Sequence, residues 1–380
     1  MLTTPYLLLA TAFTAALKAE SYLMYVTRSV ATATNHSSAL ASALSTSDEP
    51  LLTLEEIEPL LNANAQFLDA IASPHEHLTA PSSSAMVSVP LLVQLTRDWS
   101  KEGEQFRKRT YTPLLDSLLP FLAGRGGRAP AILVPGSGTG RFAYMIAERL
   151  PGATIVALDP DEHAQILAAH MLTGGKDTTE GISPPPAAAR LPARLYPSLH
   201  VANNWERSAH RLASVDVPDV PLDTLHRVET SVNLTFAVGE LDQNVLDWVV
   251  PQAFDAMATC FVLDVLRELP QTLKALHSLL APSRGLWVNL GPLEFPQPTI
   301  TLERPAEGFE RAAALTAGQM GQLIRMAGFE MLEERMVEGC EYDGLPHQLH
   351  RVVRTCYFFV ARPKEEAAEE EPGQAQRDEL

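Results

Sequence analysis

Ile132-Leu133-Val134-Pro135-Gly136-Ser137-Gly138-Thr139-Gly140 is the stretch that decides the fold of this chain. Its apolar run predicts a buried parallel strand, and its glycines allow a tight turn beneath a bound ligand. Residues 141–150 are typical of a helix whose N-terminal amides face that turn. A second apolar run ends in Asp159, where a carboxylate at a strand end can accept hydrogen bonds from ribose hydroxyls. The pattern predicts a crevice for a nucleoside cofactor.

The spacing of the glycines separates two classes of cofactor. A dinucleotide site is typical of G-x-G-x-x-G, with its third glycine at the position that Arg141 occupies here. The observed G-x-G-x-G spacing instead favours S-adenosylmethionine, which carries no pyrophosphate. The alternative is a glycine turn that binds no ligand, because a single glycine motif is a weak signal.

Composition limits the class of protein. The 380 residues are 46% hydrophobic, so the chain can bury a large core. The formal charge of −17 argues against binding to nucleic acid or anionic membranes, which need basic surfaces. No apolar run is long enough to span a membrane. The three cysteines lack C-x-x-C spacing, so we expect neither a disulfide framework nor a zinc site, and no metal.

Both ends of the chain raise the question of targeting. Residues 1–10 have some signal-peptide character without a basic segment, and residues 377–380 (Arg-Asp-Glu-Leu) are close to an endoplasmic-reticulum retention signal. A retention signal matters only after translocation. We therefore expect a cytoplasmic protein, also compatible with the nucleus, in which 6–30 form an amphipathic helix. The lumen of the endoplasmic reticulum is the alternative.

The chain divides into a helical extension, a core and a tail. Residues 1–122 are predicted to be helical, with a capping box at Thr53 and Glu56 and helices over 54–72 and 87–121. A glycine hinge leads into the core, 123–362. Residues 363–380 are rich in acidic residues and are predicted to be a disordered tail.

The core alternates predicted strands and helices. This order favours an α/β fold with a Rossmann-like, parallel-rich sheet and helices on both faces. We expect a helix over 161–172 and another from Asp264 to 280, and strands over 234–238, 254–262, 285–290 and 356–361. Residues 173–233 contain no predicted strand and form an insertion, which we expect to act as a lid or substrate wall.

Five motifs, in order along the chain, resemble those of the carnosine N-methyltransferase family. Most Rossmann-like methyltransferases carry an acid two places before the first glycine, whereas this chain has Val134 followed by Pro135, as the family does. The resemblance implies a Rossmann-like methyltransferase with S-adenosylmethionine as cofactor and a small-molecule or dipeptide substrate. The motifs are Gln94-x-x-Arg97-Asp98-Trp99-Ser100-x-Glu102-Gly103, Leu133-Val134-Pro135-Gly136-x-Gly138-x-Gly140-Arg141, Pro218-Asp219-Val220, Ala258-Thr259-Cys260-Phe261-x-x-Asp264 and Trp287-x-Asn289-Leu290-Gly291-Pro292.

The resemblance also implies roles for individual residues. Arg97 would hold the cofactor carboxylate, for which a guanidinium fork is suited, and Asp264 would be catalytic and face the substrate. Simpler alternatives are a surface ion pair of Arg97 with Asp98, a turn acid at Asp159, a core thiol at Cys260 and a helix N-cap at Asp264. The residues assigned to the cofactor are Gln94, Arg97, Gly136, Gly138, Asp159, Glu240, Leu241 and Cys260.

The departures from the family pattern concern mainly the substrate wall. Glu240 and Leu241 replace Asp-Phe at the expected adenine site, and Pro296 replaces a histidine that contacts the dipeptide. The tyrosines that precede the last strand in the family are absent from 351–356. We therefore predict methylation of an imidazole or amine nitrogen of a histidine-containing dipeptide or related small molecule. The sequence is also compatible with a homodimer. The alternative is a catalytically weak S-adenosylmethionine-binding sensor or scaffold.

Overall fold

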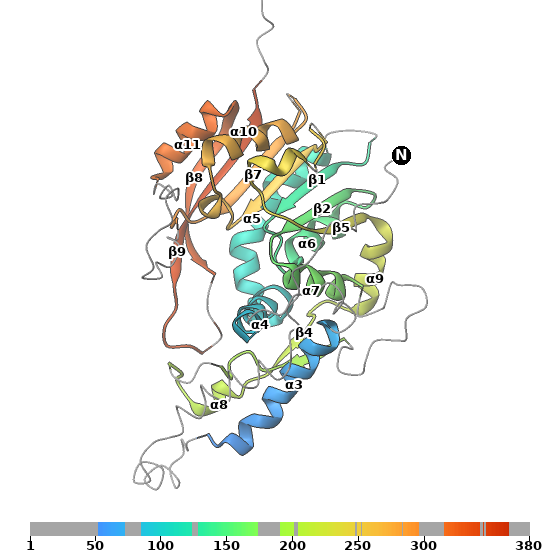
Figure 1. The fold of residues 1–380 in the computed structure, drawn as a ribbon, viewed down its shortest axis with the longest axis vertical. Helices are drawn as coiled ribbons and strands as arrows, with labels where there is room; N and C mark the ends of the chain where they lie inside the picture. Colours follow the sequence, from blue (N-terminus) through green and yellow to red (C-terminus); the bar gives the residue numbers. More distant parts are fainter. Residues whose placement is uncertain are drawn as a thin grey trace, which may run out of the picture.

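A seven-stranded sheet forms the centre of the molecule (Figure 1). The computed structural model describes residues 52–72, 85–123, 128–173, 191–200, 204–295 and 315–364, except positions 248, 252, 283, 343, 344 and 346. The strand order is β5-β2-β1-β6-β7-β9-β8. The bounds are β1 Ala131–Pro135, β2 Thr154–Asp159, β5 Asn233–Val238, β6 Ala256–Cys260, β7 Leu286–Gly291, β8 Phe329–Glu341 and β9 Val353–Pro363.

The first five strands of this order run parallel, and β9 runs in the opposite direction between β7 and the edge strand β8. β9 pairs antiparallel with both β7 and β8. The expected parallel-rich sheet is confirmed, and the four predicted core strands lie at β5, β6, β7 and β9. The long strand β8 and the helix before it, α11 (Ala317–Met326), were not predicted. Much of β8 is exposed, so it lacks the buried apolar run that marks the other strands.

Helices cover both faces of the sheet, as predicted. Successive residues of a strand point to opposite faces, and Ile132 and Val134 join one hydrophobic core while Leu133 joins the other. The first core is covered by α5, α6, α7 and α9, and the second by α10 and α11. Their bounds are α5 Glu104–Ala123, α6 Arg141–Arg149, α7 Glu162–Leu172, α9 Leu222–Ser231 and α10 Leu269–Leu279.

In the described part of the expected helical extension, residues 52–72 and 85–123, helices are present with one break in the second range. The capping box of α3 (Leu54–Ala72) is present, since the amide of Thr53 donates to Glu56 at 2.8 Å and that of Glu56 to the Thr53 hydroxyl at 3.3 Å. The expected helix over 87–121 is wrong in one respect, because α4 ends at Trp99 and a short 3₁₀ turn precedes α5. Gly103 permits this turn, since a Cβ there would lie 1.8 Å from the Arg97 carbonyl oxygen.

The segment expected to be an insertion without strands contains two. β3 (Ala193–Leu195) and β4 (Val215–Val217) form a small antiparallel sheet with the short helix α8 (Ser208–Arg211) between them. Three residues are too few to show a strand periodicity, so the sequence pattern missed them. Asn64 of α3 exchanges two hydrogen bonds, of 2.9 and 2.8 Å, with the backbone of Tyr196, which places α3 against this small sheet (Figure 1).

The predicted helix from Asp264 to 280 is wrong at its start. Residues 263–265 form one 3₁₀ turn, the backbone turns at Glu268 with φ 47°, and α10 begins at Leu269. Pro270 explains the position, because proline is tolerated in the first turn of a helix but not in its interior. Asp264 is therefore not the N-cap of α10.

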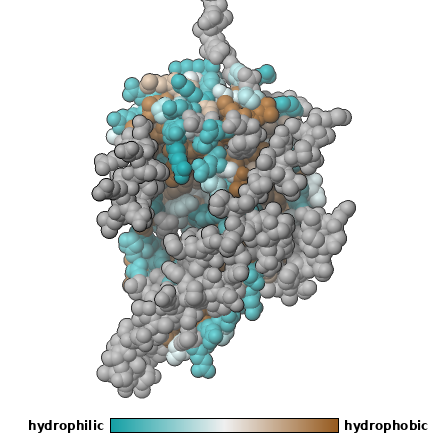
Figure 2. Space-filling view, in the orientation of Figure 1, coloured by the Kyte–Doolittle hydropathy of each residue, from teal (hydrophilic) through white to brown (hydrophobic). Residues whose placement is uncertain are grey.

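Hydrophilic and hydrophobic areas alternate on the described surface of the face seen in Figure 2. Within the described residues, no helix combines the length and apolar character that crossing a membrane requires. The expected helix over 6–30, the glycine hinge at 124–127, Pro296 and residues 365–380 of the acidic tail lie outside the described residues. The tail was expected to begin at residue 363, but Pro363 is the last residue of β9.

Candidate functional site

A cavity of about 340 Å³ opens at the carboxyl ends of the parallel strands. The chain leaves β1 toward β2 on one side and later returns to β6 on the other, so the strand order reverses beside β1. Open α/β sheets bind ligands at such a reversal point. Loops that follow β1, β2, β5 and β6 line the cavity together with residues of α4 and α5.

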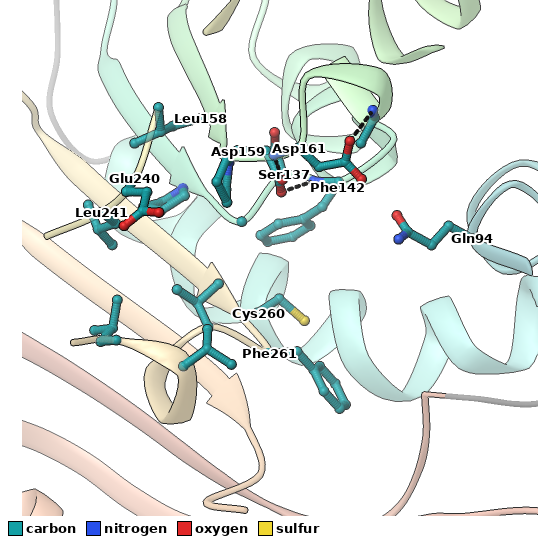
Figure 3. A pocket seen from close by; sticks show the side chains of 18 of the residues that line it. Gln94, Ser137, Phe142, Leu158, Asp159, Asp161, Glu240, Leu241, Cys260 and Phe261 are labelled. Carbon is teal, nitrogen blue, oxygen red and sulfur yellow. Dashed lines mark hydrogen bonds between the residues drawn. The ribbon is translucent and has the colours of Figure 1, made fainter. Parts of the chain in front are cut away.

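All eight residues assigned to the cofactor line this one cavity. Gln94 points into it from α4, while Glu240 and Leu241 lie on the opposite side and Cys260 lies between them (Figure 3). The structure therefore brings together residues from the helical extension and from four loops of the core. Asp264 is not among the lining residues, although its neighbours Val262 and Val265 are.

Asp159 ends β2 and faces the cavity across the glycine turn. Its Oδ2 accepts the amide of Gly138 at 2.8 Å and its Oδ1 accepts the amide of Asp161 at 2.9 Å. Burial raises the pKa of Asp159, and these two backbone donors partly oppose the rise. A carboxylate has about four acceptor positions, so two bonds leave capacity for further donors.

The glycine turn has a bare face opposite α4. Gly138 has a φ of +50°, and a Cβ there would come within 3.3 Å of the Gln94 side-chain oxygen and 4.0 Å of Nη2 of Arg97. A side chain at this position would fill the space between the turn and the helix. The absence of one lets a ligand lie against the backbone.

Arg97 forms a buried ion pair with its neighbour, and the alternative of a surface pair is wrong. Its Nε and Nη2 each donate to a different oxygen of Asp98 at 2.8 Å, and the two side chains are 9% and 1% exposed. Burial works against the charge on Arg97, but the Asp98 carboxylate, together with Tyr342 and Tyr111, raises the pKa of Arg97 well above its usual value. The Arg97 guanidinium also lies over the Tyr342 ring, 4.3 Å from its centroid.

Asp98 binds both Arg97 and the glycine turn. The sequence analysis did not assign it this role. Its carboxylate accepts the hydroxyls of Thr139 at 2.7 Å and Tyr111 at 3.0 Å. Trp99 adds a bond from its indole nitrogen to the Thr139 carbonyl at 2.8 Å. Burial would raise the pKa of Asp98, but the Arg97 charge and these hydrogen bonds lower it overall. The sequence did point to this region, because Asp98 and Trp99 both belong to the motif that begins at Gln94.

Asp219 bonds to three helices, at the end of α4, in α5 and at the start of α6. It pairs with Arg107 of α5 and, at 2.7 Å, with Arg141 at the start of α6. Its amide donates to the Trp99 carbonyl at 2.7 Å. The Pro218-Asp219-Val220 motif therefore fixes the helical extension to the core rather than contacting the cavity.

Aromatic rings form one wall of the cavity. Tyr342, which follows β8, stacks on Phe261 with ring centroids 4.4 Å apart, and Phe106 lies 6.1 Å from Tyr342. Cys260 lies beside them, and burial raises the pKa of its thiol far above the usual range. No motif pointed to Tyr342, because it follows a strand that was not predicted.

Asp264 does not line the cavity. The side chain is buried, and its Oδ2 accepts the backbone amide of Glu294 at 3.1 Å in the segment after β7. Burial raises the pKa of Asp264, and the bond from Glu294 partly opposes the rise. Glu294 in turn accepts a hydrogen bond from Arg354 at 2.9 Å. Asp264 thus connects the turn after β6 to the segment after β7.

Comparison with known proteins supports the resemblance. A family model described as Carnosine N-methyltransferase matches residues 74–365. Carnosine N-methyltransferase unmet of Drosophila melanogaster is 24% identical over 322 residues, which cover 83% of this chain and 63% of that protein. Carnosine N-methyltransferase of Schizosaccharomyces pombe is 26% identical, covering 71% and 69%, and that of Mus musculus is 24% identical, covering 71% and 61%. The chain spans about two thirds of the length of these relatives.

Proposed function

The chain belongs to the carnosine N-methyltransferase family, and we propose on that premise that it is an S-adenosylmethionine-dependent N-methyltransferase. The proposed acceptor is an imidazole or amine nitrogen of a histidine-containing dipeptide or a related small molecule. The observation that carries the proposal is the cavity beside β1. Eight residues assigned to the cofactor, spread from Gln94 to Cys260, all line it.

The cavity fits the parts of S-adenosylmethionine. When bound, this cofactor supplies an electrophilic methyl group on a sulfonium. Asp159 would accept hydrogen bonds from the ribose hydroxyls with its remaining acceptor positions. The bare backbone at Gly138 would lie against the cofactor, and Glu240 and Leu241 would border the adenine.

Arg97 is the residue we propose for the cofactor carboxylate. A guanidinium has five N–H donors, and the bidentate pair with Asp98 uses two of them. The remaining donors lie on a side chain that lines the cavity. Because Asp98 already balances the charge, Arg97 would act mainly by directed hydrogen bonds.

Positioning would do most of the catalytic work. A neutral nitrogen needs little acid–base help once its lone pair is in line with the methyl group, so the stacked rings of Phe261 and Tyr342 would serve to orient the acceptor. The raised pKa of Cys260 keeps its thiol protonated, which makes it a poor competing nucleophile. We propose that Asp264 attracts the cationic amine or the ring of the acceptor.

Two measurements test the proposal. Isothermal titration with S-adenosylmethionine and with NAD distinguishes the cofactor classes, and binding of NAD alone would refute it. Production of S-adenosylhomocysteine is then followed with carnosine, anserine, histidine and histidine-bearing peptides as acceptors. Methylation of a hydroxyl or carboxylate acceptor, and of none of these, would refute the nitrogen assignment.

The role of Asp264 needs a variant that preserves its structural bond. Asp264→Asn keeps an oxygen for the Glu294 amide but removes the charge, whereas Asp264→Ala removes both. Loss of methyl transfer in both variants, with unchanged thermal stability of Asp264→Asn, would support acceptor binding. Full activity of Asp264→Asn would restrict Asp264 to holding the segment after β7.

A second candidate function is a sensor that binds S-adenosylmethionine without turnover. It is favoured by the position of Asp264, which lies off the cavity and is engaged by the Glu294 amide. Stoichiometric cofactor binding without S-adenosylhomocysteine production, with a cell extract as the source of acceptors, would establish this alternative.

The compartment and assembly complete the proposal. We propose a cytoplasmic protein, compatible with the nucleus, that acts on small molecules or dipeptides and can form a homodimer. Fractionation of cells that express the full chain tests the compartment, and recovery in the endoplasmic-reticulum lumen would refute it. Light scattering of the purified chain measures the oligomeric state.

A further inference from the structure

Two histidines and a glutamate meet away from the cavity, where α8 approaches the connection between β8 and β9 (Figure 1). One ligand atom each of Glu206, His210 and His347 lies within 4.8 Å of the other two. The imidazole rings of His210 and His347 stack with centroids 4.1 Å apart and 19° between their planes. Oε2 of Glu206 lies 3.9 Å from Nδ1 of His210.

Backbone contacts hold these two segments together next to the cluster. Trp205 and Gln348 form an antiparallel bridge, and the amide of Leu349 donates to the Asn204 carbonyl at 2.9 Å. His347 has a φ of 67°, in the left-handed region that residues other than glycine adopt rarely. The backbone contacts therefore bring together the two segments that carry the three side chains.

We propose that Glu206, His210 and His347 form a binding site for a divalent transition-metal ion, with Zn²⁺ as the best match. Two imidazoles and one carboxylate are a donor set that zinc takes, with water in the fourth position. At zinc–ligand distances of about 2.0–2.2 Å, tetrahedral ligand atoms stand about 3.4 Å apart. Binding of one ion would draw the three ligand atoms closer together than the 4.8 Å within which they now lie.

The environment of His210 supports a ligand role. Its Nδ1 is buried and makes no hydrogen bond to the residues that the structure describes, and Glu206 at 3.9 Å is too distant to bond it directly. A buried polar atom without a partner costs free energy that a bound ion would recover. Glu206 and His347 are exposed, so the ion has a path from solvent.

The proposed metal would act on the arrangement of the chain near the cavity. His347 lies in the same connection as Tyr342, whose ring covers Arg97 and stacks on Phe261 in the cavity wall. A metal ion would fix this connection to α8. The site is separate from the cofactor cavity, so metal binding is measured without any assay of methyl transfer.

The test uses the full chain, stripped of metal with a chelator, and zinc sulfate as the probe. Isothermal titration measures affinity and stoichiometry for wild type, His210→Ala, His347→Ala and the control His226→Ala. His226 is a matched control, because it pairs with Glu229 at 3.2 Å but belongs to no three-residue cluster among the described residues. Thermal unfolding with and without zinc provides a second readout, since an ion that binds only the native state raises the melting temperature.

We expect one zinc site in wild type and His226→Ala that is lost or weakened in both cluster variants. Loss of an outer partner of a zinc ligand already costs about 10–100-fold in affinity, so loss of a ligand should cost at least about tenfold. Circular dichroism checks that the variants fold, and the absorption of Co²⁺ in place of zinc reports a tetrahedral site. Absence of zinc binding by wild type, or equal affinity and stoichiometry in wild type and His347→Ala, would overturn the proposal.

Discussion

Replacing Asp98 with alanine would remove the carboxylate that joins the helical extension to the glycine turn. Its oxygens accept bonds from Nε and Nη2 of Arg97, both at 2.8 Å, from the Thr139 hydroxyl at 2.7 Å and from the Tyr111 hydroxyl at 3.0 Å. The side chain of Asp98 is 1% exposed and that of Arg97 is 9% exposed. The variant therefore leaves a guanidinium in the protein interior without its counter-charge.

The expected loss follows from this burial. Removal of one partner of a buried ion pair costs about 3–5 kcal/mol, mostly because the remaining charge stays desolvated. Each buried hydroxyl that loses its acceptor would by itself cost about 1–3 kcal/mol, but losses within one network are not additive, so the ion pair sets the scale. We expect Asp98→Ala to lower the free energy of unfolding by about 3–5 kcal/mol, a large part of the stability of an ordinary domain.

Urea denaturation at neutral pH measures this loss, and Asp216→Ala is its control. Arg194 donates to Asp216 through Nε at 2.8 Å and Nη2 at 3.2 Å, so the pair has the same two-pronged geometry. Both side chains are more than half exposed, and water screens their interaction. We expect little change in the control. Equal unfolding midpoints for the two variants would show that burial of the Arg97–Asp98 pair does not set its contribution.

Three further predictions concern the same region. Gly140→Ala should lower the free energy of unfolding in urea by about 1–3 kcal/mol more than Gly152→Ala. Both glycines have φ near +80°, but a Cβ at Gly140 would lie 2.8 Å from that of Ala168, whereas a Cβ at Gly152 would meet no described atom within 4 Å. Equal losses in the two variants would contradict this. Burial raises the pKa of Asp159, and hydroxyl donors favour its ionised form, so S-adenosylmethionine affinity should fall as pH drops through that raised pKa. Asp159→Asn should flatten this pH dependence in titrations, and an unchanged profile would exclude Asp159 as its source. The pKa of Asp98 is lowered by folding, so its stabilisation is present above the unfolded-state value and lost as pH falls through the folded-state value; acid unfolding of Asp98→Asn should lack this step.

Much of the fold was predictable because its signals are local. The capping box at Thr53, the strand and glycine turn ending at Gly140, and the N-cap of α7 at Asp161 each depend on residues a few positions apart. Other local signals were present but misread. Pro270 marks the first turn of α10, and we had expected the helix to begin at Asp264.

The grouping of the eight assigned residues around one cavity was predictable for a different reason. Asp159 and the glycine turn follow from the rule that ligands bind at the carboxyl ends of parallel strands, whereas Gln94 and Arg97 followed only from the family motif. The motif did not distinguish contact with the cavity from support of it. Asp98 and Asp219 belong to the same motifs as the lining residues, yet they hold the extension in place.

The sequence by itself determined the alternating strands and helices and the glycine turn, since these depend on periodicity and short spacings. The class of cofactor stays a prediction. Only the tertiary structure decided that Arg97 is paired inside the protein, that Asp264 accepts a hydrogen bond from the Glu294 amide, and that His210 and His347 meet. The physical reason is that the partner of a buried charge or imidazole is set by the packing of segments distant in sequence. Burial then decides whether a given pair of charges stabilises the fold strongly or hardly at all.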